Sequence, residues 1–300
     1  YRLESLLRSL PDPQLLLTPM RRREVQFSSR IEDTHAAAAE VVMAELGPAA
    51  REEVAEVRNN LLALDLGASS PLPLSLRLLR EMHAALMSGV RGGNKTPGEF
   101  RTTQVFIGGD GPDAFRRARF VPPPPGEHLS ECLDSLEKYL NPGPGRERRQ
   151  DVLPLELAMA HYQFEAIHPF SDGNGRLGRV LISLLGFKTG QLAFPMPYVS
   201  NYLEANRQEY YDRLLAVSRD GDWEAWLGFF CRAVESACLD DLERAVRLQS
   251  LRESYRARVQ AAGSSSKGLQ LVDILFKKPA LSAAAAAKLL DATIATAQKH

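Results

Sequence analysis

The sequence predicts a mainly α-helical protein, and three observations lead to this prediction. Apolar residues recur three and four positions apart through most of the chain, which is the spacing of one face of a helix. Only residues 97–109 combine β-branched and aromatic residues with bracketing glycines, as a short β-hairpin does. Hydrophobic residues make up 44% and charged residues 25% of the 300 positions, so the chain can bury a large core, in more than one unit.

The N-terminal region, residues 1–95, is predicted to be helical. A leucine-rich helix near the start is followed by a segment that prolines, the last of them Pro19, are expected to break. Ser28 is a residue type that caps helices and Glu32 lies one turn later, so a short helix is expected near residues 24–34. Further apolar stripes predict helices within residues 35–66, interrupted at Gly47-Pro48, and within residues 74–87.

The central region, residues 96–262, is predicted to begin with the hairpin and to continue in helices. The proline run at 121–126 is a stiff spacer that is expected to pack against the hairpin. Apolar stripes then predict helices over residues 129–140, 155–167, 177–187, 201–217 and 223–262. A flexible linker at 263–268 leads to a tail, residues 269–300, whose three short helices are expected over 269–276, 282–290 and 293–300.

The loop from His168 to Arg179 combines groups that suit phosphate chemistry. It joins two predicted helices, and the second helix begins within it, so free backbone N–H groups and a partial positive charge are expected there. Its glycines would let this backbone curl around an anion, with arginines three apart leaning toward the same anion. An acid, Asp172, suits this place if a divalent cation lies between it and the phosphates. His168 is the group suited to taking a proton near neutral pH.

Two plainer interpretations of this loop fit its residues less well. Residues 173–178 also spell the dinucleotide-binding pattern G-x-G-x-x-G, but that pattern follows a strand and precedes an acid by about twenty residues. Here a helical pattern precedes it and no acid lies near Tyr198. A simple helix–helix turn with solvated charges does not account for a base, an acid, glycines and two arginines packed together.

The same loop resembles the signature of the Fic family, H-x-F-x-[D/E]-G-N-G-R-x-x-R, at every fixed position. The resemblance implies a Fic-type helical bundle with a β-hairpin flap, and transfer of AMP from ATP onto a protein hydroxyl. It implies that His168 is the general base, that Asp172 holds Mg²⁺ and that Arg179 binds the γ-phosphate. The implied ATP-binding residues are Asp172, Gly173, Asn174, Gly175, Arg176, Arg179, Tyr210 and Tyr211, the last two in the adenine pocket. An intact Gly175 favours AMP transfer over phosphate transfer.

A second resemblance concerns regulation. Ser28 and Glu32 occupy the fixed positions of the family's inhibitory motif, [S/T]-x-x-x-E-[G/N], which implies that Glu32 pairs with Arg179 and keeps it from the γ-phosphate. Asp33 departs from this motif, because Gly or Asn accepts a left-handed backbone more readily. We therefore expect the inhibitory helix either to end differently or to hold less firmly than in the family.

The hairpin resembles the family's target-binding flap. By this resemblance, Thr103, Val105, Phe106 and Ile107 would clamp an extended segment of a protein substrate by strand addition. Because such binding uses the main chain and needs few particular side chains, modification of the chain itself is a second possibility. The tail resembles the start of a winged helix-turn-helix, which leaves DNA or another protein open as its partner.

Charge and cysteine content exclude some classes of protein. Lys plus Arg and Asp plus Glu each number 37, so the net charge draws the chain neither to nucleic acid nor to acidic lipid. Three cysteines without a CxxC pair, no apolar run that could span a membrane and no signal peptide predict a cytoplasmic protein. Its start at Tyr1 suggests part of a longer chain, and a homodimer is left open.

The sequence thus predicts an ATP- and Mg²⁺-dependent protein adenylyltransferase that Glu32 inhibits. Two alternatives stay open. One is a DNA-binding regulator that senses a nucleotide, and the other is removal of AMP by hydrolysis, with Glu32 orienting the water.

Overall fold

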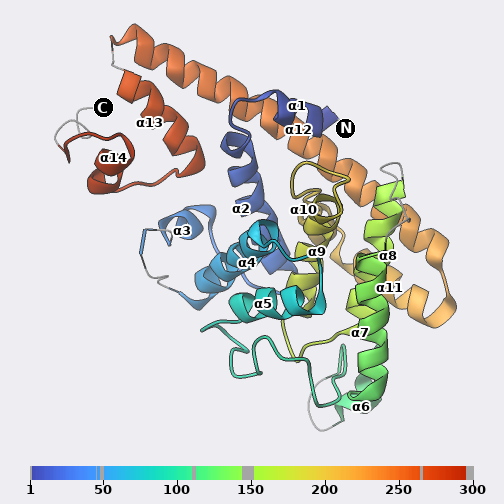
Figure 1. Ribbon diagram of the computed structural model, residues 1–300. Coiled ribbons are helices and arrows are strands. Elements are labelled where there is room, and N and C mark those ends of the chain that lie inside the picture. The colour runs from blue at the N-terminus through green and yellow to red at the C-terminus, as the bar shows by residue number, and fades with distance from the viewer. Residues whose placement is uncertain are drawn as a thin grey trace.

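The computed structural model describes residues 2–44, 46–47, 51–109, 113–143, 152–263 and 266–294, and it is mainly helical, as predicted (Figure 1). Within these residues, the β-structure is limited to an isolated antiparallel bridge between Ile107 and Phe120. None of the described helices is both long and apolar enough to cross a membrane.

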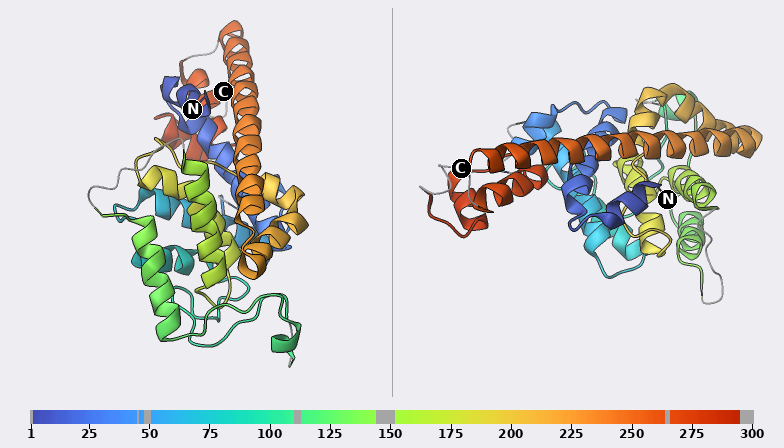
Figure 2. Two further views of the ribbon diagram at one scale, coloured as in Figure 1. Left: turned by 90° about the vertical axis from the view of Figure 1, so that its right-hand side faces the viewer. Right: turned by 90° about the horizontal axis from the view of Figure 1, so that it is seen from above.

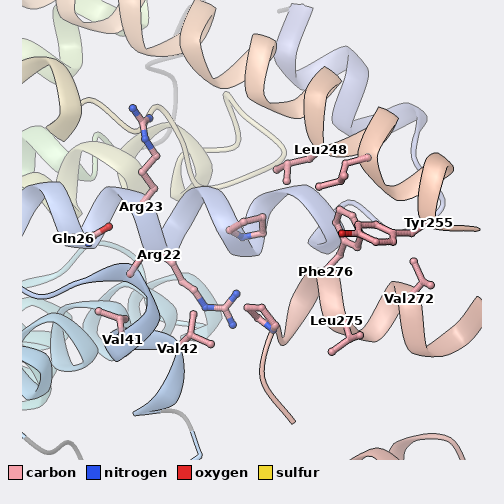
Figure 3. Close-up of a pocket in the computed structure, with 14 residues that line it drawn as sticks. Arg22, Arg23, Gln26, Val41, Val42, Leu248, Tyr255, Val272, Leu275 and Phe276 are labelled. Atoms are coloured by element: carbon pink, nitrogen blue, oxygen red, sulfur yellow. The ribbon is translucent and has the colours of Figure 1, made fainter. Parts of the chain in front are cut away.

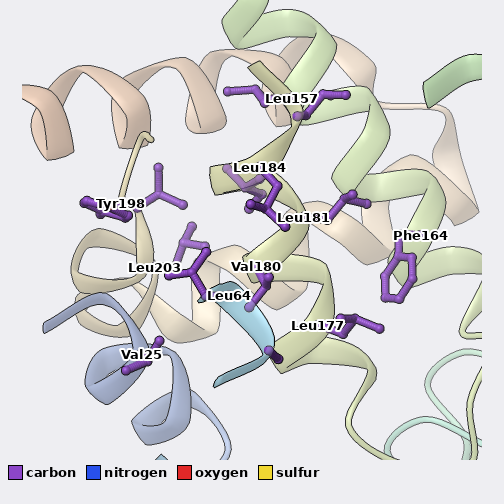
Figure 4. Packing of buried hydrophobic residues seen from close by; sticks show 14 of the residues in the cluster. Val25, Leu64, Leu157, Phe164, Leu177, Val180, Leu181, Leu184, Tyr198 and Leu203 are labelled. Atoms are coloured by element: carbon purple, nitrogen blue, oxygen red, sulfur yellow. The ribbon is translucent and has the colours of Figure 1, made fainter. Parts of the chain in front are cut away.

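Two helices of the predicted catalytic region form the centre of the core. α8 (Leu153–Ile167) packs against α9 (Asn174–Lys188), and α4 (Glu52–Ser69), α2 (Gln14–Ile31) and α12 (Trp223–Ala261) pack around them. α9 is buried over most of its length, because apolar residues cover all its sides and not one stripe. Figure 4 shows side chains of α9 between those of α8, α4 and α2.

The remaining helices of the body surround this centre. They are α1 (Arg2–Ser9), α3 (Ala38–Met43), α5 (Leu76–Leu86), α6 (Ala114–Arg117), α7 (Glu127–Leu140), α10 (Ser200–Ala205) and α11 (Arg207–Asp220). α5 packs on α4, α7 packs on α8, and α11 packs on α12. The long helix α12 crosses the whole body and extends beyond it (Figure 2).

The tail packs against the body. α13 (Ser266–Lys277) runs back beside the end of α12 and also contacts α2 (Figure 2). Asp273 of α13 accepts hydrogen bonds from Arg252 at 2.7 Å and Arg256 at 2.9 Å. α14 (Ala283–Leu289) follows, with Ser282 as its N-cap. The third tail helix, predicted over 293–300, falls almost entirely outside the described residues, so the winged-helix resemblance stays a prediction.

Two expectations for the N-terminal region were wrong. Pro19 does not break the chain but lies inside α2, where it removes only the single hydrogen bond that its N–H would have made. Ser28 does not begin a helix either, since it lies in the last turn of α2, and Glu32 is the C-cap. Buried apolar residues continue along α2 from Leu15 to Ile31, and this packing outweighs the local signals.

The flap differs from the predicted hairpin over 97–109. Its first arm pairs only at Ile107, whose N–H donates to Phe120 O at 3.0 Å, so the second arm lies after α6. The proline run packs against the first arm, as predicted, and Gln104 donates a hydrogen bond to Pro122 O at 2.9 Å.

Candidate active site

The loop between α8 and α9 is fixed by its own side chains. His168 ends α8 in a left-handed conformation, with φ of 49°, and the chain turns at once into Pro169. The Asn174 side chain accepts from Phe170 N at 2.9 Å and donates to Phe170 O at 2.8 Å, which closes the loop into a ring. Phe170 is fully buried and stacks on His83, with ring centroids 3.8 Å apart.

His83 connects this loop to the start of the flap. One ring nitrogen lies 3.0 Å from Asp172 O, and the other accepts from Gly98 N at 2.8 Å. Because a carbonyl only accepts, the proton is on the nitrogen that faces Asp172. Burial lowers the pKa of His83, so the ring is neutral and joins the two segments by one donor and one acceptor.

His168 is arranged to accept a proton. Its Nδ1 lies 3.3 Å from the carbonyl oxygen of Glu165, so Nδ1 carries the ring hydrogen and Nε2 is left as an acceptor. Burial lowers the pKa of His168 to about 4, and the positive charge of Arg101 acts in the same direction. Arg101 also donates from Nε to His168 O at 2.8 Å, which anchors the backbone of the base to the flap.

The N-terminus of α9 faces the same space. Gly173, with φ of 74°, is its N-cap residue, and α9 begins at Asn174. A Cβ at Gly175 would lie 2.4 Å from Glu32 Oε1 and 3.0 Å from Arg179 Nη1, so a larger residue would collide with the ion pair. Glycine lets these two side chains approach the backbone closely, and a larger residue would force the ends of both to shift.

Asp172 has its own cationic partner. Lys95 Nζ lies 3.1 Å from Asp172 Oδ2, and the backbone N–H of Gly173 donates to Oδ1 at 2.7 Å. Burial opposes ionisation, but these two donors outweigh it and lower the pKa of Asp172. A charged carboxylate that already attracts a cation fits Mg²⁺, which is commonly held by one or two carboxylates together with substrate phosphates. Among the described residues, no group of three or more His, Cys, Asp or Glu side chains forms a metal cage.

Arg179 and Glu32 form an ion pair. Arg179 Nη2 donates to Glu32 Oε1 at 2.7 Å and to Ser28 O at 2.8 Å, while Nε donates to Ser28 Oγ at 3.0 Å. The arginine side chain is 1% exposed, and that of Glu32 is 36% exposed. Burial alone would lower the pKa of Arg179, but the charge of Glu32 and its hydrogen bond, together with Tyr210 and Glu165, outweigh burial and raise it. The two residues of the inhibitory resemblance therefore both bind this arginine.

Asp33 holds the turn after α2 in a way that the sequence did not indicate. It adopts the left-handed conformation, with φ of 58°, and accepts two hydrogen bonds from Arg207 of α11, at 2.6 and 2.9 Å. Tyr211, one turn further along α11, donates to Ile31 O at 3.3 Å. The expected strain at Asp33 is thus accompanied by an additional ion pair to α11.

Arg176 also faces a carboxylate. Its Nη1 lies 3.2 Å from Glu56 Oε2, and both side chains are buried. Thr34 donates to the same Glu56 oxygen at 2.7 Å, so this pair is connected to the turn that carries Glu32. Sequence reasoning missed Glu56, because an acid within a helical stripe gives no signal of its partner.

A cavity of about 360 Å³ brings seven of the predicted site residues together. Its lining includes His168, Gly175, Arg179, Glu32, Tyr210, Tyr211 and, from the flap, Ile107. The other predicted site residues do not line it: Ser28, Thr103, Val105, Phe106, Asp172, Gly173, Asn174 and Arg176. Tyr210 is 1% exposed and its hydroxyl bonds to His161 at 2.8 Å, so it is a core residue with one side toward the cavity.

Comparisons with known proteins agree with this geometry. A model described as "Fic/DOC family" matches residues 73–185, and a model described as "Fic/DOC family N-terminal" matches residues 1–69. The chain belongs to the Fic/DOC family. Both the loop with His168 and Arg179 and the helix with Ser28 and Glu32 lie inside the matched segments of this Fic protein.

The chain is similar to curated proteins named protein adenylyltransferase Fic. It is 34% identical to that of Culex quinquefasciatus over 166 residues, which are 54% of this chain and 28% of the relative. It is 36% identical to that of Aedes aegypti over 141 residues, which are 46% of this chain and 23% of the relative. The matched region therefore spans less than a third of the length of these two relatives.

Solved Fic structures share the fold. A Fic family protein from Desulfovibrio desulfuricans superposes with a TM-score of 0.59 at 21% identity, covering 87% of this chain and 77% of the other. A fragment of Fic-1 from C. elegans gives a TM-score of 0.59 at 23% identity, covering 83% and 70%. At these identities the likeness concerns the Fic fold alone.

A larger cavity, of about 660 Å³, lies away from the Fic motif between α2, α3, α12 and α13 (Figure 3). Its lining is mostly apolar, with Leu248, Tyr255 and Phe276 gathered at one end. Arg22 donates to Lys277 O at 2.7 Å and Arg23 pairs with Asp240 at 2.6 Å, so its two arginines bind the protein itself. The smaller cavity, which contains a base, an arginine and a helix N-terminus, is therefore the candidate active site.

Proposed function

We propose that this chain is a protein adenylyltransferase, which transfers AMP from ATP to a hydroxyl of a target protein or of itself. The observation that carries the proposal is that His168, Gly175 at the start of α9 and Arg179 line one cavity. A base with a free acceptor nitrogen, unpaired helix N–H groups and an arginine are what nucleotidyl transfer needs. The name of the relatives, protein adenylyltransferase Fic, supports the same reaction.

The reaction then follows from the positions of these groups. His168 Nε2 takes the proton of a target Ser, Thr or Tyr hydroxyl, and the oxygen attacks the α-phosphorus of ATP. The bond to the β-phosphate breaks, and pyrophosphate leaves toward Arg176 and Arg179. Asp172 would hold Mg²⁺, which when bound neutralises charge on the phosphates. The low pKa of His168 keeps the ring neutral, and therefore able to accept a proton, over the whole physiological range.

We propose further that the chain in this state is inhibited. Arg179 is held by Glu32 and Arg176 by Glu56, so both motif arginines bind carboxylates in place of phosphates. An arginine engaged by a carboxylate is not free for a phosphate. A nucleotide can bind productively only after Glu32 has left Arg179.

The target segment is proposed to bind along the first arm of the flap. Ile107 is the bridged position, and Thr103, Val105 and Phe106 precede it on the same arm. An extended segment could pair there through its main chain and bring its hydroxyl toward His168, with little demand on its sequence.

The proposal is tested by label transfer. The chain is incubated with Mg²⁺ and ATP labelled at the α-phosphate, with and without a cell lysate, and in parallel with ATP labelled at the γ-phosphate. Label on protein from the α-position alone supports AMP transfer. Label from the γ-position would indicate phosphate transfer, and loss of AMP from pre-modified protein without any transfer would indicate the hydrolytic alternative.

A further inference from the structure

Arg179 depends on one segment for its hydrogen bonds. The three bonds described above all go to Ser28 and Glu32, at the end of α2. Only Glu32 contributes a charge. The Arg179 side chain is 1% exposed with Glu32 in place. When Glu32 leaves, the guanidinium loses this anion, and an uncompensated buried charge is unfavourable.

A second carboxyl group faces the same cavity. Glu165 lies one turn before His168 on α8, lines the cavity with Glu32 and Arg179, and has a side chain that is 13% exposed. Its Oε1 atom is buried and has no hydrogen-bond partner among the described residues. A buried oxygen without a partner is unfavourable unless another state of the site uses it.

Two glycines of α9 make room for the two carboxyl groups. A Cβ at Gly175 would lie 2.4 Å from Glu32 Oε1, and a Cβ at Gly178 would lie 2.3 Å from Glu165 Oε1. Gly178 directly precedes Arg179 in the helix. The two acids therefore approach the same turn of α9, one at each glycine, and both interact electrostatically with Arg179.

We propose that Glu165 is a positioning residue that becomes the counter-ion of Arg179 when Glu32 departs, and that it accepts a proton when the terminal phosphate of a nucleotide binds Arg179. This inference rests on the proposed function. In this proposal Glu165 is protonated more often in the inhibited site and in the nucleotide-bound site than in the released empty site, where its charged form faces Arg179. Arg179 thus faces one anion in each state.

The surrounding groups support this sequence of states. Burial raises the pKa of Glu165 to about 7, the charge of Arg179 from α9 lowers it, and the charge of Glu32 raises it. The pKa of Glu165 therefore falls when Glu32 leaves and rises when a phosphate takes its place. The other titratable side chains that line the cavity or lie beside Glu165 are His161, Tyr162 and His168 of α8 and Tyr210 and Tyr211 of α11. Burial raises the pKa of Tyr210 and of Tyr211, and it lowers the pKa of His161 to about 3 and that of His168 to about 4.

His161 also provides a place for the proton. Its Nδ1 is buried without a partner and lies 4.0 Å from Glu165 Oε1, while its Nε2 bonds to Tyr210. In the tautomer whose hydrogen lies on Nε2, the neutral ring can accept at Nδ1, so a small rotation of a protonated Glu165 would let it donate there. The charged form turns to Arg179 instead.

The test is the proton linkage of ATP binding. In the Glu32→Gly protein, ATP binding in EDTA is measured by calorimetry between pH 6 and pH 8, in buffers of different ionisation enthalpy. EDTA prevents transfer and removes the protons that metal binding would release. We expect the affinity to fall with rising pH, by at most about tenfold per pH unit for one linked proton. Adding Glu165→Gln should remove this component of the slope and of the proton uptake.

Matched variants separate linkage from structural damage. Glu165→Asp keeps a titrating carboxyl and should retain the pH slope. Asp241→Asn removes another buried carboxyl whose pKa burial raises to about 7, but which lies outside the cavity, and should leave the slope unchanged. Equal slopes and equal proton uptake with and without Glu165→Gln would overturn the inference. Failure of the Glu32→Gly protein to bind ATP both in EDTA and with Mg²⁺ present would instead count against the proposed function.

Discussion

Removing the Glu32 carboxylate should activate the enzyme by an amount that the structure bounds. A hydrogen bond to a charged group contributes about 1.5–3 kcal/mol when buried. The Glu32 side chain is 36% exposed, so the lower end of this range applies. Because 1.4 kcal/mol corresponds to tenfold, Glu32→Gly should raise the initial rate of AMP transfer by about tenfold at sub-saturating ATP.

The assay is incorporation of label from α-labelled ATP into the chain itself, at matched ATP and Mg²⁺. Glu32→Gln keeps the size of the side chain without its charge and should give a smaller increase. Glu131→Gln, at an exposed position on α7, is the control and should behave as wild type. Arg179→Ala added to Glu32→Gly should cancel most of the gain, since both residues act on one phosphate. Equal rates for wild type and Glu32→Gly would refute the reasoning.

The melting temperature of Glu32→Gly should fall by a few degrees, because Arg179 loses its charged partner.

Three further predictions concern single groups. His168→Ala should lower the rate of label transfer by about a hundredfold to ten-thousandfold, while the ATP affinity measured by calorimetry stays within a few-fold of wild type. Transfer at the wild-type rate would show that His168 is not the base. Since burial lowers the pKa of His168 to about 4, the rate at saturating ATP should stay flat from pH 8 to pH 6 and fall only toward pH 4. A midpoint near 6.5, the value of an exposed histidine, would show that the ring is not desolvated during turnover. Burial and the neighbouring charge of Glu24 raise the pKa of Asp241 from 3.8 to about 7 in the folded protein. The unfolded chain therefore loses this proton first, and the folded protein loses stability as the pH rises from about 4 to 7. Asp241→Asn should for this reason increase the melting temperature more at pH 8 than at pH 4.5. A gain that is the same at both pH values would mean that Asp241 is not protonated in the folded state.

The sequence was informative where residue types themselves carry the chemistry. His168, Asp172 and the glycines between two helical patterns indicated a phosphate-binding loop before any contact was known. Contacts between residues far apart in the chain were harder to predict from the sequence. The pairing of Arg179 with Glu32, 147 positions earlier, was predicted only from the resemblance to a family. The pairing of Arg176 with Glu56 was not predicted.

Local signals failed where packing overrode them. Ser28 has the chemistry of an N-cap, yet its hydroxyl accepts a hydrogen bond from Arg179 within the last turn of a helix that apolar burial extends from residue 14. Glu165 falls four residues after His161, on the buried side of α8, and its acidic side chain at such a position was the one signal of an unusual environment. Its relation to Gly178 depends on helix packing, which the sequence does not show.

The closed ring formed by Asn174 and Phe170 affects which part of the site loses conformational freedom when a nucleotide binds. With the loop bonded to itself and stacked on His83, the phosphate cradle is already shaped before a ligand arrives. Little conformational entropy remains to be lost there on binding. The step that must occur first is reorientation of one partly exposed side chain, that of Glu32, and such rotamer changes are fast compared with the folding of a loop. Under the proposed inhibition, control of this site depends on how often the Glu32 rotamer that binds Arg179 is populated, and the loop does not have to form again for each nucleotide.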